Sequence, residues 1–361
     1  MKLVVFGLSL SSSWGNGHAT TYRALLRAFA ARGHDVVFYE WDAPWYGGKN
    51  RDLPVPGWCR LELYGEWAAI APRALAEARE ADAVMVGSYV REGARVVDAL
   101  ADAGVEPLFF YDIDTPVTVA ALRAGGAEYL RADQVPLFAR YFSFTGGPFL
   151  RDVLQGELGA RDAVPLYCSV DAERYHPRAP DPELAVDLAY MGTYAPDRQP
   201  VIERFLLGVA RRLPERRFLV AGPQYPRGVE WGANVRHVSH LPPARHPAFY
   251  GSARWQLNAT RADMVAAGWS PSVRLFEAAA CGAAMISDRW PGIEHFFTPG
   301  REILLPRSTA EVAGIVAATP DDERRAIGLA ARARILAAHT SGHRAEELER
   351  HLAVMAPARG E

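Results

Sequence analysis

Short apolar runs alternate with segments of helical periodicity along most of the chain. The first run, Leu3 to Leu8, leads into a Ser/Gly-rich loop, and the next segment, His18 to Arg32, repeats its apolar residues at helical spacing. Gly33 is well placed to end this helix, and Val36 to Glu40 then indicates a second buried strand. A strand, a helix and a strand in this order predict a βαβ unit, in which the two strands are parallel.

The same alternation continues in two blocks, which are separated by a segment rich in Pro and charge, Asp171 to Glu183, typical of a linker. The further elements expected in the first block are Ala83 to Gly87, a helix near Glu92 to Ala103, Leu108 to Tyr111, Phe142 to Phe144 and a strand around Leu166. Those expected in the second block are Leu188 to Met191, a helix over Val201 to Arg212, Phe218 to Ala221, Trp255 to Asn258, a helix over Ser272 to Cys281, Ala284 to Ser287, and mostly helix over Thr309 to His351.

This pattern predicts an α/β protein made of two doubly wound, Rossmann-like domains, residues 1–170 and 171–361. The last helix is a candidate to pack back on the N-terminal domain. Ligands of open α/β sheets bind beyond the carboxyl ends of the strands, so we expect two such domains to face each other across a cleft that holds the site.

Composition excludes several classes of protein. Hydrophobic residues make up 49% and charged residues 23% of 361 residues, which is ordinary for a globular chain. The net charge of -2 gives no general field for nucleic acid or membrane surfaces. Three isolated cysteines without a C-x-x-C pair suggest neither disulfides nor structural zinc. We therefore expect a cytoplasmic protein without signal peptide or transmembrane segment; its oligomeric state is not predicted.

The basic residues are almost all arginine. Lys2 and Lys49 are the only lysines among the 40 basic residues. Schiff-base chemistry and a P-loop both need a lysine in the site, and neither position suits that role. A phosphate clamp in this chain must therefore consist of arginines, hydroxyls or backbone amides.

The loop from Ser9 to Thr21 holds the first candidate site. Its G-x-G, with Glu40 ending the second strand, suggests a dinucleotide site, but the glycines lie too far beyond the strand and Thr20 replaces the third. The alternative is a flexible loop that brings His18 to the cleft as a general base, against a helix-cap or packing role for this histidine. The neighbouring residues expected to line the cleft or bind an acceptor are Trp14, Gly15, Asn16 and Gly17.

Two carboxylates follow a later strand of the first block. Asp112 and Asp114 occupy alternate positions, which predicts that they point to the same face. Asp-x-Asp can signal a divalent metal, but two carboxylates do not make a metal cage, so we prefer that one of them orients the ring of His18. A further polar strand end, FSFTGGP, adds two candidate acceptor contacts, Thr145 and Gly146.

The second block carries candidate groups for binding an anion. Gly192 and Thr193 follow a strand and precede a helix, where backbone amides can approach phosphate oxygens. Arg274 and Glu277 lie three apart on a later helix and share a face, so the arginine can grip a pyrophosphate and the carboxylate can accept from ribose hydroxyls; a surface ion pair is the alternative. The other candidate donor contacts are Gly268, Ser270 and Ser272 at the start of that helix, with Arg198 and Arg261 as second-choice clamps.

These motifs resemble a known family. The G-N-G-H of the first loop, the continuation ARGHDVVFYE and above all SPSVRLFEAAACGAAMISDRWPGIEHFF look like the GT-B glycosyltransferases, and within them like the CgeB-like members of group 1. The resemblance implies a nucleotide-sugar donor, UDP- or dTDP-linked, in the C-terminal domain, an acceptor in the N-terminal domain, and no metal or other cofactor. It also implies that Glu277 binds the ribose and that Gly192 belongs to the phosphate loop.

Two departures leave the stereochemistry open. Retaining group 1 enzymes carry a Glu eight residues before the second one, where this chain has Trp269, and their phosphate-binding lysine has no counterpart here. The G-N-G-H element is also similar to inverting GT-B enzymes, in which such a histidine, here His18, activates the acceptor hydroxyl. The expected function is a hexosyltransferase-type reaction on a small-molecule, glycan or protein acceptor; the alternatives are a nucleotide-sugar epimerase and a non-catalytic nucleotide-sugar-binding protein.

Overall fold

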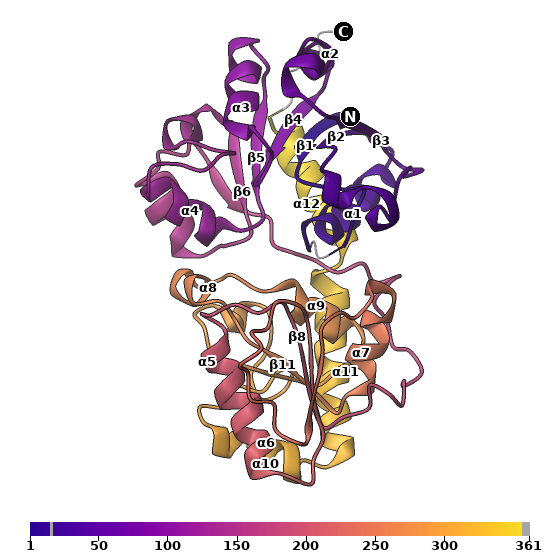
Figure 1. Cartoon of the computed structure of the whole chain (residues 1–361). Coiled ribbons are helices and arrows are strands. Elements are labelled where there is room, and N and C mark those ends of the chain that lie inside the picture. The colour runs from indigo at the N-terminus through magenta and orange to yellow at the C-terminus, as the bar shows by residue number, and fades with distance from the viewer. Residues whose placement is uncertain (15–16, 356–361) are drawn as a thin grey trace. The chain divides into compact units, whose positions relative to one another are not determined.

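The computed structural model describes residues 1–14 and 17–355, and the chain divides into two compact units. The N-terminal unit comprises Met1–Ser169 together with the C-terminal segment that begins at Ser341, and the C-terminal unit comprises Val170–Thr340. Each unit is built on one sheet whose neighbouring strands are all parallel (Figure 1). The fold is therefore mixed α/β with two Rossmann-like sheets, as the alternation of apolar runs predicts.

The sheet of the N-terminal unit has seven strands in the order β3-β2-β1-β4-β5-β6-β7. Their bounds are β1 Lys2–Gly7, β2 Asp35–Trp41, β3 Arg60–Tyr64, β4 Ala83–Gly87, β5 Leu108–Asp112, β6 Arg140–Ser143 and β7 Ala163–Pro165. The helices are α1 Gly17–Ala30, α2 Trp67–Arg79, α3 Gly93–Asp102, α4 Thr115–Arg123 and α12 Ser341–Ala353, with short helical turns at Pro44–Tyr46, Gly48–Asn50, Ala132–Leu137 and Leu150–Gln155.

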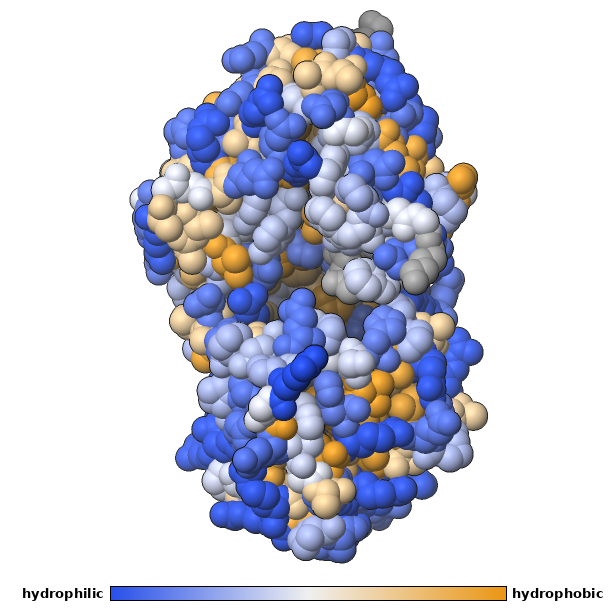
Figure 2. Space-filling model, in the orientation of Figure 1, coloured by the Kyte–Doolittle hydropathy of each residue, from blue (hydrophilic) through white to orange (hydrophobic). Residues whose placement is uncertain are grey.

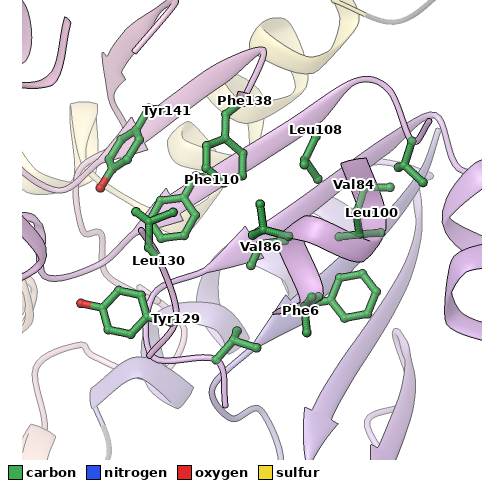
Figure 3. Close-up of a cluster of buried hydrophobic side chains, with 14 of the residues drawn as sticks. Phe6, Val84, Val86, Leu100, Leu108, Phe110, Tyr129, Leu130, Phe138 and Tyr141 are labelled. Carbon is green, nitrogen blue, oxygen red and sulfur yellow. The ribbon is translucent and has the colours of Figure 1, made fainter. Parts of the chain in front are cut away.

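Buried aromatic and aliphatic side chains fill one face of this sheet. Phe6 of β1, Val86 of β4 and Phe110 of β5 lie in one cluster with Leu100 of α3 and Tyr141 of β6 (Figure 3). All five are at most 1% exposed, and each buried side chain of this size contributes about 1.5–3 kcal/mol of transfer free energy. The cluster fixes the carboxyl ends of β1, β4 and β5 relative to one another.

The last helix belongs to the N-terminal unit. α12 packs beside α1, and Glu349 of α12 pairs with Arg32 and, at 3.2 Å, with His34. Arg344 of α12 also donates through Nε to the carbonyl oxygen of Tyr167 at 3.2 Å. The chain thus returns to the first unit after completing the second.

The sheet of the C-terminal unit has five strands in the order β10-β9-β8-β11-β12. They are β8 Leu188–Met191, β9 Phe218–Ala221, β10 Val235–Val238, β11 Trp255–Asn258 and β12 Met285–Ser287. The helices are α5 Gln199–Ile202, the turn Glu203–Leu207, α6 Gly208–Arg212, α7 His246–Ser252, α8 Ala262–Ala267, α9 Val273–Ala280, α10 Thr309–Ala318 and α11 Asp321–Ala338, with short turns at Pro243–Arg245 and Ile293–His295. Trp255 and Leu257 are fully buried in the core of this sheet.

The two strands that the sequence pattern did not predict, β3 and β10, each lie at one edge of their sheet. Their sequences, RLELY and VRHV, contain charged residues and are only partly buried, because an edge strand is not covered on both faces. The face shown in Figure 2 is mainly hydrophilic, with apolar residues in separate patches. Helices α2, α7 and α8 were also not predicted.

Candidate functional site

A tight glycine turn follows β8 in the C-terminal unit. A Cβ atom at Gly192 would lie 2.5 Å from the hydroxyl of Tyr190 and 2.8 Å from Nη2 of Arg274, and one at Gly222 would clash with the carbonyl oxygen of Gly192. The backbone after β8 and the backbone after β9 therefore approach each other closely only because both residues are glycine. This contact places the guanidinium of Arg274 directly against the Gly192 turn.

Two arginines, Arg198 and Arg274, lie at this turn, and the charge of a third, Arg261, acts on Arg198. Arg198 donates through Nη2 to the carbonyl oxygen of Thr193 at 3.0 Å. Burial lowers the pKa of Arg198, and repulsion from Arg274 and Arg261 lowers it further. The interactions with Tyr190 and Asp197 raise this pKa and offset part of the change. The Nε of Arg198 is buried and has no hydrogen-bond partner among the described residues. Asp197 supplies one negative charge beside these three cations, by its pair with Arg261 at 3.4 Å, and the excess of positive charge attracts an anion.

The guanidinium of Arg274 is fixed by neutral acceptors. Its Nε donates to the carbonyl oxygen of Met191 at 2.5 Å and its Nη1 to Oδ1 of Asn258 at 2.9 Å, and the group lies 4.8 Å from the centre of the Tyr190 ring. In residues 1–14 and 17–355, Arg274 forms no ion pair. Its charge is therefore positioned but not neutralised by a paired carboxylate.

Asn258, at the carboxyl end of β11, is the hub of this arrangement. Its Oδ1 accepts from Arg274 and, at 2.9 Å, from the hydroxyl of Ser272, and its Nδ2 donates to the hydroxyls of Thr260 at 3.0 Å and Ser287 at 2.9 Å. Asn258 is 2% exposed, so these four bonds satisfy a buried amide completely. Ser272 is the residue that precedes α9, as the sequence predicts, but its hydroxyl bonds to Asn258 and not to the helix.

Glu277 lies on the same helix, one turn further into the unit. Its carboxylate accepts from the hydroxyl of Tyr250 at 2.9 Å and also from Tyr175. Burial raises the pKa of Glu277, while hydrogen bonds from these two tyrosines and the charges of Arg174 and Arg274 oppose the change. Glu277 is only 8% exposed, so its carboxylate is a buried hydrogen-bond acceptor and not part of a surface ion pair.

The other candidate donor residues lie around α8. Arg261 precedes α8 and pairs with Asp197 at 3.4 Å, while Gly268 ends the helix with a positive φ of 67°. Ser270 is buried two residues later. Between them Trp269, which stands where retaining group 1 enzymes carry glutamate, has a φ of 43°, and its backbone N–H donates to the carbonyl oxygen of Pro291 at 2.6 Å.

In the N-terminal unit, the loop after β1 is held from two sides. Glu40 accepts from the backbone N–H groups of Leu10 at 2.6 Å and Ser11 at 2.8 Å, and from the hydroxyls of Ser9 and Ser11. Asp52 accepts from the N–H and hydroxyl of Ser13 at 2.8 and 2.7 Å. Glu40 is fully buried, and both of its carboxylate oxygens accept hydrogen bonds from this loop. They are therefore not available to a ribose, which argues against the dinucleotide alternative.

His18 lies in the first turn of α1 and meets a residue that the sequence did not single out. Its ring packs edge-on against Tyr89 with centres 5.1 Å apart, and the hydroxyl of Tyr89 donates to Asp114 at 3.1 Å. Burial lowers the pKa of His18, and the negative charge of Asp114 partly opposes this. Burial thus favours the neutral imidazole, the form that accepts a proton.

Asp112 has different surroundings from Asp114. Its carboxylate is fully buried and accepts from the hydroxyls of Tyr141 at 2.5 Å and Thr118 at 2.8 Å, and from the backbone N–H of Asp114 at 3.2 Å. Burial raises the pKa of Asp112 to about 6, against the effect of these hydrogen bonds. Of the two carboxylates, only Asp114 contacts the residue that packs on His18.

The remaining predicted acceptor contacts are placed as follows. Trp14 is half exposed, Gly17 is the first residue of α1, and Gly15 and Asn16 lie outside the described residues. The backbone N–H of Thr145 donates to the hydroxyl of Ser143 at 3.0 Å, and a side chain at Gly146 would clash with Tyr167. The backbone of Thr145 is therefore already hydrogen-bonded to Ser143 in the turn after β6, and Gly146 leaves no room for a side chain there.

Residues missed by the sequence argument share one property: their role depends on contacts across the fold. Tyr89 follows β4, Asn258 ends β11 and Tyr190 lies within β8, so nearness to a strand end was a signal only for the first two; none of the three belongs to a recognisable motif. Within the described part of the chain, no three His, Cys, Asp or Glu side chains are grouped so as to hold a metal ion. The helices in that same part are too short or too polar to cross a membrane.

Residues 198–350 match the family described as glycosyl transferase-like. No curated protein matches the chain in sequence. Among solved structures, sucrose-phosphate synthase from Thermosynechococcus elongatus is 15% identical with a TM-score of 0.67, over 98% of this chain and 100% of that one. HepE from Anabaena in complex with UDP and glucose is 13% identical with a TM-score of 0.68, over 98% and 100%.

An alpha-glucosyltransferase in complex with UDP-glucose and DNA containing an abasic site is 12% identical with a TM-score of 0.70, over 98% of this chain and 99% of that one. At these identities the likeness establishes the fold. It is the fold of GT-B glycosyltransferases.

Proposed function

We propose that this protein is a glycosyltransferase that moves a sugar from a nucleoside diphosphate to an acceptor hydroxyl. The observation that carries the proposal is the Gly192 turn, where Arg198 and Arg274 make contacts and where the charge of Arg261 also acts on Arg198. A diphosphate carries the negative charge that this cluster lacks, and guanidinium groups can bind two phosphate oxygens at once. The match to a glycosyl transferase-like family and the UDP complexes of proteins with the same fold support this choice of ligand.

The donor residues have distinct roles in this proposal. Arg274, with Ser272 nearby and the backbone of Gly192 and Thr193, binds the diphosphate and stabilises the charge that develops on it as it leaves. Glu277, held by Tyr250, accepts from the ribose. The other donor contacts proposed are Arg198, Arg261, Gly268 and Ser270.

His18 acts as the general base and Asp114 as its orienting partner. The bond between the anomeric carbon and the diphosphate oxygen breaks, and its electron pair leaves with the nucleotide. A bond forms between that carbon and the acceptor oxygen, whose proton passes to the imidazole of His18. Neutral His18, with a pKa lowered by burial, is suited to this step.

Several finer assignments belong to the same proposal. The donor is UDP- or dTDP-linked, the reaction is of the hexosyltransferase type and needs no metal, and the sequence pattern of α9 and the segment after it favours a CgeB-like group 1 enzyme. We assign the N-terminal unit to the acceptor and the C-terminal unit to the donor, and we expect a cytoplasmic protein without a nucleic-acid substrate. Trp14, Gly17, Thr145 and Gly146 are proposed acceptor contacts, together with Gly15 and Asn16.

The test is release of nucleotide from a panel of UDP- and dTDP-sugars, with and without acceptor mixtures, at a fixed concentration of chelator. Transfer predicts acceptor-dependent release, and His18→Ala should lower the rate by about 10² to 10⁴ with UDP affinity unchanged. The anomeric configuration of the product then distinguishes a base at His18, which requires inversion, from a retaining mechanism.

Two other results would replace the proposal. Conversion of the donor alone into an isomer, detected by NMR, would make the protein a nucleotide-sugar epimerase. Calorimetric binding of donor without nucleotide release under any condition would make it a binding protein. Failure to bind any nucleoside diphosphate would reject the role of the three arginines.

A further inference from the structure

An aromatic cavity of about 330 Å³ opens at the carboxyl ends of β1, β2 and β4 in the N-terminal unit. Its volume lies at the lower end of the ~300–1,000 Å³ range of small-molecule sites. The side chains that matter for its chemistry are Trp41, Trp45, Tyr46, Tyr89, Arg91 and Glu128. None of them was singled out by motif or spacing.

The tryptophans form a fixed platform. The indole N–H of Trp41 donates to the carbonyl oxygen of Gly65 at 3.1 Å, and the rings of Trp41 and Trp45 pack edge to face with centres 5.3 Å apart. Trp45 also packs against Tyr46 at 5.8 Å. Trp45 is nevertheless 54% exposed, which is unusual for so large an apolar side chain. An exposed indole that packs against two neighbouring rings at the wall of a cavity is suited to stack on a flat ligand surface.

Polar groups of opposite charge stand beside this platform. The guanidinium of Arg91 lies 4.0 Å from the centre of the Trp41 ring, and across the described chain it forms no ion pair. Glu128 accepts from the backbone N–H of Glu92 at 3.1 Å and is otherwise exposed. A cation and an anion in one small cavity disfavour a strongly charged ligand and offer donors and acceptors for hydroxyl groups.

Backbone strain marks the segment that joins this cavity to His18. Tyr89 and Glu92 have φ angles of 64° and 53°, which non-glycine residues rarely adopt and which cost about 1–3 kcal/mol each. Tyr89 lines the cavity and also packs on His18, while its hydroxyl bonds to Asp114. The strained turn therefore holds one ring against both the cavity and the proposed base.

We infer that the cavity binds the acceptor, and that the acceptor is a neutral saccharide whose ring stacks on Trp45 while its hydroxyls bond to Arg91 and Glu128. This inference rests on the proposed function and adds the class of acceptor. A sugar ring presents an apolar face of C–H groups and a rim of hydroxyls, which match the indole platform and the two charged side chains. An aryl alcohol would use the platform but leave the polar pair without partners.

The experiment measures binding of maltose, cellobiose and lactose, and of naphthol and nitrophenol, to the full chain by saturation-transfer NMR. UDP binding is measured on the same samples by calorimetry. The variants are Trp45→Ala, Trp45→Phe, which keeps an aromatic face, and Trp58→Ala, which removes a tryptophan of the same unit that does not line the cavity. Because Trp45 is exposed, we expect its two variants to melt as the unmodified protein does; the melting temperature of Trp58→Ala, whose side chain is half-buried, is measured so that binding is compared only between folded proteins.

The inference predicts that at least one saccharide binds, that Trp45→Ala weakens this binding roughly tenfold or more, and that Trp45→Phe and Trp58→Ala retain most of it. UDP affinity should be the same in all variants. Binding of aryl alcohols in preference to saccharides, absence of saccharide binding, or saccharide binding insensitive to Trp45→Ala would overturn the inference while UDP binding stands. Loss of UDP binding in the unmodified protein would instead reject the proposed function.

Discussion

Arg274 provides the sharpest test of the donor site, because its guanidinium is positioned without a paired carboxylate. The substitution Arg274→Gln keeps a side chain able to donate to Met191 or Asn258 but removes the charge and the nitrogen, Nη2, that faces Gly192. If the site binds a diphosphate, this variant should fold and lose affinity for UDP.

The expected size of the effect follows from the charged hydrogen bond that Arg274 would donate to a phosphate oxygen. A hydrogen bond to a charged group contributes about 1.5–3 kcal/mol, which corresponds to a roughly 10- to 150-fold rise in the dissociation constant. A ligand at about 100 times its dissociation constant adds about 2.7 kcal/mol to stability, whereas the same concentration acting on a site weakened about 100-fold adds only about 0.4 kcal/mol.

Differential scanning calorimetry converts this difference into temperature. For a unit of this size 1 kcal/mol shifts Tm by about 2–4 °C, so UDP should raise the Tm of the unmodified protein by roughly 5–11 °C and that of Arg274→Gln by about 1–2 °C. Arg332→Gln is the matched control, since Arg332 also donates through Nε to a carbonyl oxygen, that of Ala280 at 3.2 Å, but lies on α11 away from the Gly192 turn.

A UDP-induced shift in Arg274→Gln equal to that of the unmodified protein would refute the reasoning. An equal loss in Arg332→Gln would do the same, because it would show that removal of any such arginine weakens the unit nonspecifically. A lower Tm without ligand is expected for Arg274→Gln and does not decide the question, since only the shift on adding UDP is compared.

Three other substitutions test the remaining parts of the site. Glu277→Gln should weaken binding of UDP more than that of its deoxyribose analogue, measured by calorimetry, and equal losses would contradict a contact with the ribose. The negative charge of Asp114 raises the pKa of His18, so Asp114→Asn should lower that pKa and move the acid limb of the pH–rate profile to lower pH. An unchanged acid limb would show that Asp114 does not act on His18. Gly222→Ala should cost about 1–3 kcal/mol in urea unfolding, because its Cβ would clash with backbone, whereas Gly228→Ala, with open space around it, should cost little.

The central strands of both sheets were predictable because they are buried on both faces and appear as continuous apolar runs. The edge strands β3 and β10 lack that signal. The last helix shows a different limit: its periodicity predicts a helix, but its position beside α1 depends on pairs such as Arg32 with Glu349, which are 317 residues apart in the chain.

The candidate site was predictable where spacing on one element decides it. Arg274 and Glu277 share a helix, so their common direction follows from helical geometry alone. Asn258 could not be found in this way, because its importance comes from four partners on three other segments of the chain. Tyr89 was missed for the same reason, since it acquires a role only when α1 and the segment after β5 are packed around it.

In the sequence, the scarcity of lysine served only to exclude mechanisms that need one. At the Gly192 turn, the structure shows what an arginine does that a lysine could not. Arg274 uses Nε for the Met191 carbonyl and Nη1 for Asn258, and its third nitrogen, Nη2, faces the glycine. Two bonds thus fix the plane of the group while the third nitrogen remains directed at the Gly192 turn, where we propose that the diphosphate binds. A lysine has a single nitrogen on a flexible stem, so anchoring it would consume the only group able to bind the anion. Arginine at this position is therefore required by the way the turn is built, because the same side chain must be both held and available.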